Sequence, residues 1–259
     1  MSRIKFIDLS TYQSWLSLRD LPKDVTGVII KAGGVLIKDG RTQYTDSQFV
    51  RFCDEAQQLG LPVGVYYFSC ANSAADGRRE AEHCYNIIKG RNFSLPVYYD
   101  CESKYSTSRS GLTAAINAFY DYMTGKGFRA GLYTNPNWYK RKINTSALRK
   151  DMSIWLAQWS DAISSPTISC DIWQYGHIYI KGRMVDADYI LNERIIEMEE
   201  KVYHHLGEIT DPEMRAAVAF FCNKGIISTD TDGSFNINQT KLECITLMYR
   251  IYNQQKITI

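Results

Sequence analysis

Residues Leu95-Pro-Val-Tyr-Tyr-Asp100-Cys-Glu102 form a short apolar segment that ends in two carboxylates separated by one residue. Side chains alternate across a strand, so Asp100 and Glu102 are predicted to share one face, with Cys101 on the other. Two adjacent, partly dehydrated acids repel each other, which favours one protonated and one ionised carboxyl near neutral pH. The segment therefore indicates a general acid with a charged partner. An acidic turn without chemistry is the alternative interpretation.

Strand-like and helix-like segments alternate along the first three quarters of the chain, which is typical of a parallel sheet with helical crossovers. Strands are predicted at residues 3–9, 27–32, 62–68, 95–100, 129–133, 154–159, 171–175 and 183–186. Helices are predicted at residues 46–59, 74–89, 112–125 and 137–149, and glycines at 60, 90 and 127 are their stop signals. Because the late connections are too short for full helices, the pattern predicts a lopsided α/β barrel of eight strands.

Four acids fall at predicted strand ends. Asp8 ends the first strand, Asp100 and Glu102 end the fourth, and Asp186 ends the eighth. Closed parallel barrels carry their sites at the C-terminal rim, and closure makes the first and eighth strands neighbours. Each acid alone is more often a helix cap or a surface charge. Together they predict a single acid-lined mouth.

Aromatic residues gather near the same rim. They are Tyr12, Tyr66, Tyr67, Phe68, Tyr98, Tyr99, Tyr133, Trp155, Trp159, Trp173 and Tyr175. Rings with polar tips stack against the apolar faces of sugars and form hydrogen bonds at their edges. About half of such a set is expected in the core, because strand alternation buries alternate side chains. The remainder, beside the acids, indicates a glycan-binding groove.

Composition excludes several other classes. The 259 residues carry 30 basic and 28 acidic side chains without long runs of either, so no nucleic-acid partner is expected. No membrane span is expected, and the N-terminus lacks the pattern of a signal peptide, which predicts a soluble product made in the cytosol. Seven cysteines without CxxC spacing are expected to be unbridged and mostly buried. No metal ion and no cofactor is expected.

The order of short motifs resembles family 25 glycoside hydrolases, the Chalaropsis-type lysozymes common among bacteriophage endolysins. The motifs are Phe6-Ile-Asp8-Leu-Ser10-Thr-Tyr12-Gln13, Gly64-Val-Tyr66-Tyr-Phe68, Tyr99-Asp100-Cys-Glu102, Leu132-Tyr133-Thr134, Ile154-Trp155-Leu-Ala157-Gln158, Ile172-Trp173-Gln174-Tyr175 and Val185-Asp186. The resemblance covers about residues 3–195. It implies an irregular (β/α) barrel of eight strands with fewer helices. It also implies hydrolysis of the β-1,4 bond between N-acetylmuramic acid and N-acetylglucosamine in bacterial peptidoglycan.

Carried over by position, the resemblance makes Glu102 the general acid and Asp100 its charged neighbour. Asp8 and Asp186 match the two remaining active-site acids, which order the acid pair and the central sugar. An oxocarbenium-like transition state needs a proton donor on one side and negative charge or a nucleophile on the other. The substrate's own acetamido oxygen, steered by Asp100, is the favoured nucleophile, and water or a carboxylate is the alternative.

The same resemblance assigns a set of substrate-binding residues: Tyr66, Tyr67, Phe68, Tyr133, Trp155, Gln158, Trp173 and Gln174. The family commonly has Tyr-His-Phe where this chain has Tyr66-Tyr67-Phe68. Altered subsite contacts with retained catalysis are therefore expected. Trp173 alternatively closes the bottom of the barrel.

The character of the sequence changes after about residue 195. We predict a catalytic barrel over residues 1–197, a linker over 198–207 and a small, mainly α-helical module over 208–259. Thr210-Asp-Pro-Glu213 is a helix start, and amphipathic helices are predicted at 214–224 and 241–252. The module resembles a single S-layer homology module, which implies binding of a secondary cell-wall polymer through Lys241 and Glu243. Such modules usually work in sets of three, so either subunits associate into a homo-oligomer that completes the set, or the single module only packs on the barrel.

Three other functions compete with the muramidase hypothesis. A chitinase-like hydrolase also uses paired acids, but its longer run of spaced acids on one strand is missing. A catalytically silent glycan- or cell-wall-binding protein would not need all four acids. A metal-dependent nuclease lacks its basic footprint here. For the endolysin, the phage resemblance implies synthesis in the host cytoplasm and action on the wall after holin-type release or lysis.

Overall fold

The structure is a computed structural model and describes residues 3–160, 162, 164–196 and 202–257. The chain divides into two compact units, Met1–Glu197 (unit 1) and Met198–Ile259 (unit 2). Each unit has a hydrophobic core of its own. The two units are therefore described separately.

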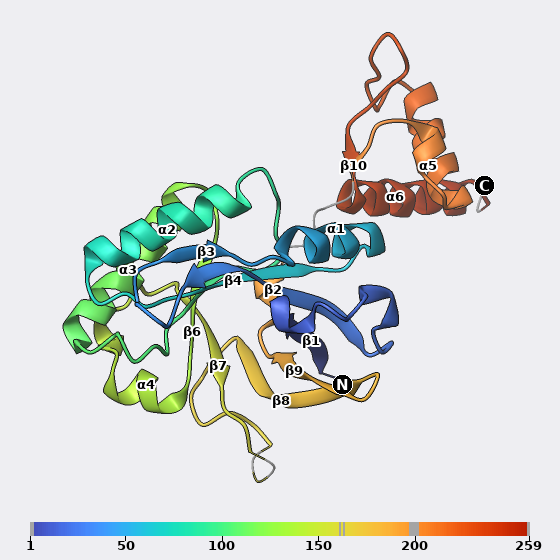
Figure 1. The fold of residues 1–259 in the computed structure, drawn as a ribbon. Coiled ribbons are helices and arrows are strands. Elements are labelled where there is room, and N and C mark those ends of the chain that lie inside the picture. The colour runs from blue at the N-terminus through green and yellow to red at the C-terminus, as the bar shows by residue number, and fades with distance from the viewer. Residues whose placement is uncertain (1–2, 161, 163, 197–201, 258–259) are drawn as a thin grey trace. The chain divides into compact units, whose positions relative to one another are not determined.

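Unit 1 contains nine strands and four α-helices within the described residues (Figure 1). The strands are β1 (Ile4–Leu9), β2 (Val25–Val35), β3 (Gln43–Thr45), β4 (Val63–Phe68), β5 (Val97–Asp100), β6 (Ala130–Thr134), β7 (Ser153–Ala157), β8 (Ile172–Ile180) and β9 (Arg183–Ile190). The helices are α1 (Phe49–Leu59), α2 (Ala74–Ile88), α3 (Arg109–Gly125) and α4 (Pro136–Arg141).

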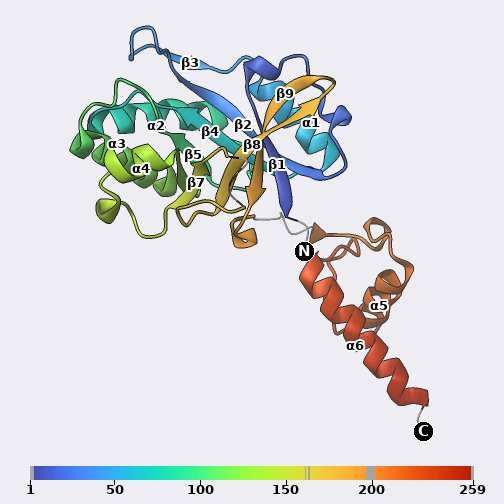
Figure 2. The same ribbon diagram turned by 90° about the horizontal axis from the view of Figure 1, so that it is seen from below.

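The sheet closes into a barrel of eight strands. Its order is β1-β9-β8-β7-β6-β5-β4-β2, β1 also pairs with β2, and β3 adds to the far edge of β2. Helices α2, α3 and α4 lie together on one side, away from β8 and β9 (Figures 1 and 2). The prediction of an irregular eight-stranded α/β barrel with fewer helices is confirmed.

The prediction that all eight strands run parallel is wrong. Strand β9 is antiparallel to both of its neighbours, β8 and β1. Strands β8 and β9 form a hairpin whose two turn residues, Lys181 and Gly182, have φ of 50° and 77°. Positive φ at both central residues is the geometry of the tight turns that join antiparallel strands. Both strands are also longer than predicted, so Asp186 lies within β9 and does not end it.

Alternation along the strands separates two layers of core. Ile7, Val28, Tyr67, Tyr99 and their equivalents face outward and pack against the helices. The barrel interior is filled by a second cluster comprising Phe6, Ile29, Leu95, Tyr98, Tyr133, Trp155, Ile172, Ile190 and Ile195. Large rings fit because small residues oppose them: a Cβ on Gly27 would lie 2.1 Å from the Phe6 ring, and one on Gly131 would lie 2.5 Å from the Tyr98 ring.

The predicted helix ends agree with the backbone for the first three helices. Gly60, Gly90 and Gly127 follow α1, α2 and α3 with φ of 65°, 81° and 85°, the left-handed conformation in which glycine ends helices. The fourth prediction, residues 137–149, is too long. Helix α4 begins at Pro136 after the Asn135 cap and ends at Arg141, and only a 3₁₀ turn at Thr145–Ala147 follows.

Unit 2 contains β10 (Val202–Tyr203), α5 (Pro212–Asn223), β11 (Ile237–Asn238) and α6 (Gln239–Ile257). Asp211 caps α5 and Pro212 occupies its first turn, as the sequence predicts. Residues 198–201 of the predicted linker lie outside the described residues. Its second half is not a linker, because β10 pairs with β11 and Tyr203 is buried in the core of unit 2. Across the described residues, no helix combines the length and apolar character that a bilayer crossing requires.

Candidate active site

Three strands and one loop bring the predicted acids to one end of the barrel. Asp8 is the fifth residue of β1, Asp100 is the last of β5, and Glu102 lies two residues beyond Asp100. Because β9 runs antiparallel, its early residue Asp186 reaches this same rim. Asp8 and Asp100 are buried, Asp186 is half-buried and Glu102 is exposed. The acids thus line a mouth from deep to shallow.

A hydrogen-bond network fixes Asp8. Gln174 on β8 donates from Nε2 to Asp8 Oδ2 at 2.8 Å. Its Oε1 accepts from Tyr133 Oη at 3.1 Å and from Trp159 Nε1 at 2.9 Å. Since an indole N–H can only donate, these contacts determine the orientation of the Gln174 amide. Two residues predicted to bind substrate, Tyr133 and Gln174, therefore support an acid from below.

Burial raises the pKa of every acid at this mouth. The pKa of Asp8 rises to about 8, because of its burial and then the charge of Asp186, against the opposing Gln174 hydrogen bond. Burial also raises the pKa of Asp186, which faces His177 across the β8–β9 hairpin. A group of carboxyls with raised pKa values holds protons at neutral pH. Such a site can supply an acid without a metal ion.

The Asp100–Glu102 pair differs from the sequence prediction in where the proton lies. The pKa of Asp100 is raised well above its ordinary value by burial and by the Glu102 charge. Its Oδ1 is also buried without a hydrogen-bond partner among the described residues. Partial desolvation raises the pKa of Glu102, but Lys31 and Asn135 oppose this rise and its side chain reaches solvent. In the substrate-free site the proton therefore favours Asp100, which was expected to be the charged partner.

Lys31 is a site residue that the sequence argument missed. It lies on β2, and its ammonium sits 5.4 Å from the Tyr66 ring, 5.1 Å from the Phe68 ring and 5.9 Å from the Tyr44 ring. Its charge lowers the pKa of Asp8, Asp100 and Glu102. Aromatic faces attract cations at such distances. A lone lysine within an apolar strand that carries no acid gave no signal in the sequence.

Asp188 is the second missed residue. It is two residues beyond Asp186, so alternation places it inside the barrel, one layer deeper. It is fully buried and accepts a hydrogen bond from Trp155 Nε1 at 2.7 Å. Trp155 is itself buried, with its ring 4.4 Å from that of Tyr133. Trp155 therefore forms the floor beneath the acids. The signal was available, because Val185-Asp-Ala-Asp188 alternates apolar and acidic residues.

Three residues predicted to bind substrate do not face the acid-lined mouth. Tyr67 points outward, where it is fully buried and bonds to His83 Nδ1 at 3.0 Å, so the Tyr66-Tyr67-Phe68 variation does not alter a subsite contact through Tyr67. Trp173 also faces outward, beside Tyr189, and closes neither groove nor barrel bottom. Gln158 holds the following loop through Thr167. At the rim, Tyr12 and Trp159 are 81% and 52% exposed and available to a ligand.

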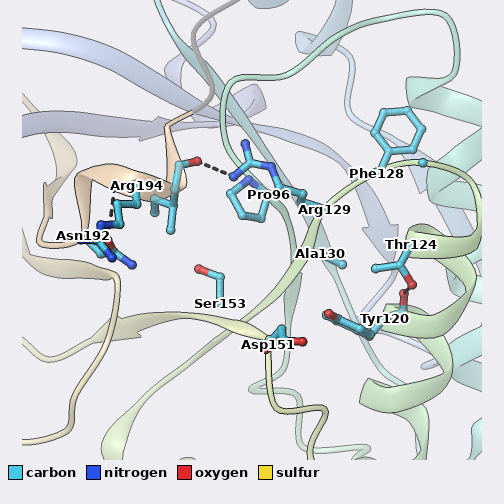
Figure 3. A pocket seen from close by; sticks show the side chains of 12 residues that line it. Pro96, Tyr120, Thr124, Phe128, Arg129, Ala130, Asp151, Ser153, Asn192 and Arg194 are labelled. Atoms are coloured by element: carbon cyan, nitrogen blue, oxygen red, sulfur yellow. Dashed lines mark hydrogen bonds between the residues drawn. The ribbon is translucent and has the colours of Figure 1, made fainter.

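A described cavity of about 490 Å³ lies elsewhere (Figure 3). It is lined by Ala130 and Ser153, the first residues of β6 and β7, and by Asn192 and Arg194 after β9. These positions belong to the N-terminal ends of the parallel strands, opposite the acids. Arg129 crosses it to donate to the Ile195 carbonyl at 2.6 Å. This cavity is distinct from the acid-lined mouth.

The proposed wall-binding positions are only partly described. Lys241 is exposed near the start of α6, and the side chain of Glu243 lies outside the described residues. Among the described side chains, no group of three histidines, cysteines or acids is arranged to hold a metal ion. The structure does not assign a ligand to unit 2.

Comparison with known proteins places the barrel in a family. The model of the glycosyl hydrolases family 25 matches residues 7–182. The autolytic lysozyme of Clostridium acetobutylicum is 34% identical over 125 residues, which is 48% of this chain and 36% of that protein. The modular autolysin LytC from Streptococcus pneumoniae, solved with a synthetic peptidoglycan ligand, is 23% identical with a TM-score of 0.59, covering 71% of this chain and 46% of that one.

A further solved structure, the catalytic domain of endolysin ply40 from bacteriophage P40 of Listeria monocytogenes, is 20% identical with a TM-score of 0.61 over 75% of this chain and 96% of that domain. This chain thus spans well under two thirds of the autolytic lysozyme and of the modular autolysin. The structural likeness supports the fold, and the family model covers most of the chain. The chain therefore belongs to glycosyl hydrolase family 25.

Proposed function

We propose that this protein is a peptidoglycan hydrolase of the endolysin type. It cleaves the β-1,4 bond between N-acetylmuramic acid and N-acetylglucosamine. The observation that carries the proposal is the convergence of Asp8, Asp100, Glu102 and Asp186 at one rim of a family 25 barrel. Exposed aromatic residues at that rim supply faces for sugar rings.

In this mechanism Glu102 protonates the leaving oxygen, because it is the acid that solvent and substrate can reach. Asp100 assists through the substrate acetamido group. When the acetamido N–H donates to Asp100, its ionised form gains a partner, and the proton that Asp100 holds in the empty site is free to move to Glu102. The acetamido oxygen then attacks the anomeric carbon as the leaving group departs. Asp8 and Asp186 hold the pair and the sugar in place.

The test is digestion of purified Gram-positive peptidoglycan, followed by borohydride reduction and identification of the sugar at the new reducing ends. We expect muramitol, and loss of at least about 1,000-fold in rate for Glu102→Gln. Glu82→Gln, an acid on α2 that pairs with Arg78, is the matched control and should retain activity. Glucosaminitol would overturn the bond assignment. No new reducing ends on several wall types would support the silent binding protein instead.

For unit 2 we propose a wall-binding or self-associating role. The support is its sequence resemblance to an S-layer homology module and the exposure of Leu247, Met248 and Ile251 along α6. Apolar side chains three and four residues apart share one helix face, which suits a partner surface. Light scattering of the full chain should show a homo-oligomer that Leu247→Glu disrupts. A monomer whose wall binding is lost in Lys241→Ala would favour a secondary cell-wall polymer as the partner.

A further inference from the structure

Asp188 occupies a position that the proposed mechanism does not explain. It lies on β9, between Phe6 of β1 and Gln174 of β8, and its carboxyl is fully buried inside the barrel. Burying an ionised carboxylate is unfavourable unless its oxygens are paired. Trp155 donates to Oδ1 at 2.7 Å, whereas Oδ2 is buried with no hydrogen-bond partner among the described residues. One oxygen of Asp188 therefore lacks a donor.

The neighbouring acid on β1 is Asp8, which lies two residues beyond Phe6, the register partner of Asp188, on the same face of the strand. A hydrogen bond between the side chains of Asp8 and Asp188 lowers the pKa of Asp8 and raises the pKa of Asp188. Gln174 already donates to Oδ2 of Asp8, so that oxygen is an acceptor. Oδ1 of Asp188 is likewise an acceptor, because the Trp155 indole can only donate. By elimination, a proton held between the two carboxyls lies between the remaining oxygens, Oδ1 of Asp8 and Oδ2 of Asp188.

The surrounding charges favour retention of that proton. Asp186 on the same strand faces Asp8, and Asp100 on β5 lies close enough for Asp8 to raise its pKa. Lys31 on β2 is the cation that opposes them, and His177 on β8 pairs with Asp186. The phenols Tyr66, Tyr98, Tyr133 and Tyr175 from β4, β5, β6 and β8 complete the surroundings. With so few cations facing it, the pair is more stable with one negative charge than with two.

We propose that Asp188 is a positioning residue that shares one proton with Asp8 and thereby fixes the charge and orientation of Asp8 in the substrate-free site. The shared proton does not depend on the proposed function; only its effect on catalysis rests on that function. The shared proton limits the pair to one negative charge, so that Asp8 remains close to Asp188 and to Gln174. Loss of the proton would set two carboxylates against each other directly beneath the sugar-binding mouth.

The test is a carbon-13 carboxyl NMR titration of the full-length protein labelled at aspartate, with resonances assigned from Asp8→Asn and Asp188→Asn. In the parent protein, both resonances should respond at the same two pH steps, because interacting acids titrate as a pair. In Asp188→Asn, Asp8 should titrate in one step, because the acid that shares its proton is gone. Asp186→Asn should lower the midpoint but preserve the two-step behaviour. Asp24→Asn, a surface acid bonded to Lys5, should change nothing.

Single-step titration of Asp8 in the parent protein, or two-step titration of Asp8 in Asp188→Asn, would overturn the proposal. If Asp188→Asn does not fold, the reciprocal measurement applies, because Asp188 in Asp8→Asn should also titrate in one step at lower pH. These readouts need no turnover. A protein that shows the shared proton but releases no reducing ends would contradict the proposed function alone.

Discussion

Gln174 Nε2 donates to Asp8 Oδ2 at 2.8 Å and so joins two residues 166 positions apart. The contact exists because β9 enters antiparallel between β1 and β8, which brings both strands to the same interior layer. The same Gln174 amide accepts hydrogen bonds from Tyr133 and Trp159 through its Oε1. The position of Asp8 therefore depends on Gln174 of β8 and, through it, on Tyr133 of β6 and Trp159 in the loop after β7.

Replacing Gln174 by leucine should lower activity without unfolding the barrel. The change removes the donor that lowers the pKa of Asp8 and leaves the Tyr133 and Trp159 donors without their acceptor. Loss of one hydrogen bond to a charged group is worth about 1.5–3 kcal/mol, which corresponds to roughly a 10- to 100-fold lower kcat/KM. Kinetics on soluble peptidoglycan fragments measure this. Gln57→Leu, on the exposed face of α1, serves as the control.

Replacing Lys31 by methionine should move the upper limb of the pH–activity profile to higher pH. Lys31 lowers the pKa of Asp100 and of Glu102, so its removal raises both pKa values and keeps the acid pair protonated further into the alkaline range. Methionine retains contact with the Tyr66 and Phe68 rings. The profile is best recorded at about 0.15 M salt, where distant charges are screened. Lys23→Met removes the same charge from the surface, and an equal shift there would contradict a local effect.

Replacing Tyr67 by phenylalanine should leave KM unchanged and reduce stability. The Tyr67 hydroxyl bonds to His83 and to the Gly34 carbonyl on the outer face of the sheet, remote from the mouth. Losing these bonds costs about 1 kcal/mol in the free energy of unfolding.

Trp159→Ala, by contrast, should raise KM by about tenfold, since stacking of a ring on a ligand is worth about 1–2 kcal/mol. Urea denaturation and kinetics on both variants test the two expectations. A raised KM for Tyr67→Phe would show that Tyr67 contributes to substrate binding and would contradict its outward placement.

Replacing Glu80 by glutamine should reduce the pH-dependence of stability. Burial between α2 and the sheet raises the pKa of Glu80 to about 7, despite its hydrogen bond from Tyr99 at 2.7 Å. The folded chain therefore binds the proton more tightly than the unfolded chain, and stability falls as pH rises from about 4.5 to about 7. The part of the fall that Glu80 contributes, and that Glu80→Gln removes, should be roughly 3 kcal/mol. Thermal unfolding across this range measures it, and Glu82→Gln should keep the parent's slope.

The barrel could be predicted from the sequence because strand patterns and the glycines that end helices are local signals. The sequence predicted Asp8, Asp100 and Glu102 for a similar reason, since these acids sit where apolar strands end, and it predicted Asp186 as the end of a strand that in fact continues to Ile190. It failed at β9, where the Lys181-Gly182 turn reverses the chain and carries Asp186 and Asp188 into the interior. It also failed for Tyr67 and Trp173, because one residue of register moves a side chain to the opposite face.

By itself, then, the sequence determined the barrel, the Asp100–Glu102 pair and the family motifs, all of which depend on residue type and spacing along short segments. The tertiary structure decided which acids meet, which one holds a proton and which aromatics face the groove. Those properties depend on burial and on neighbours from distant strands: Lys31 opposite Asp100, Gln174 against Asp8, and Trp155 beneath Asp188. A pKa is set by the dielectric and charges that surround a group, and only the closed barrel defines those surroundings.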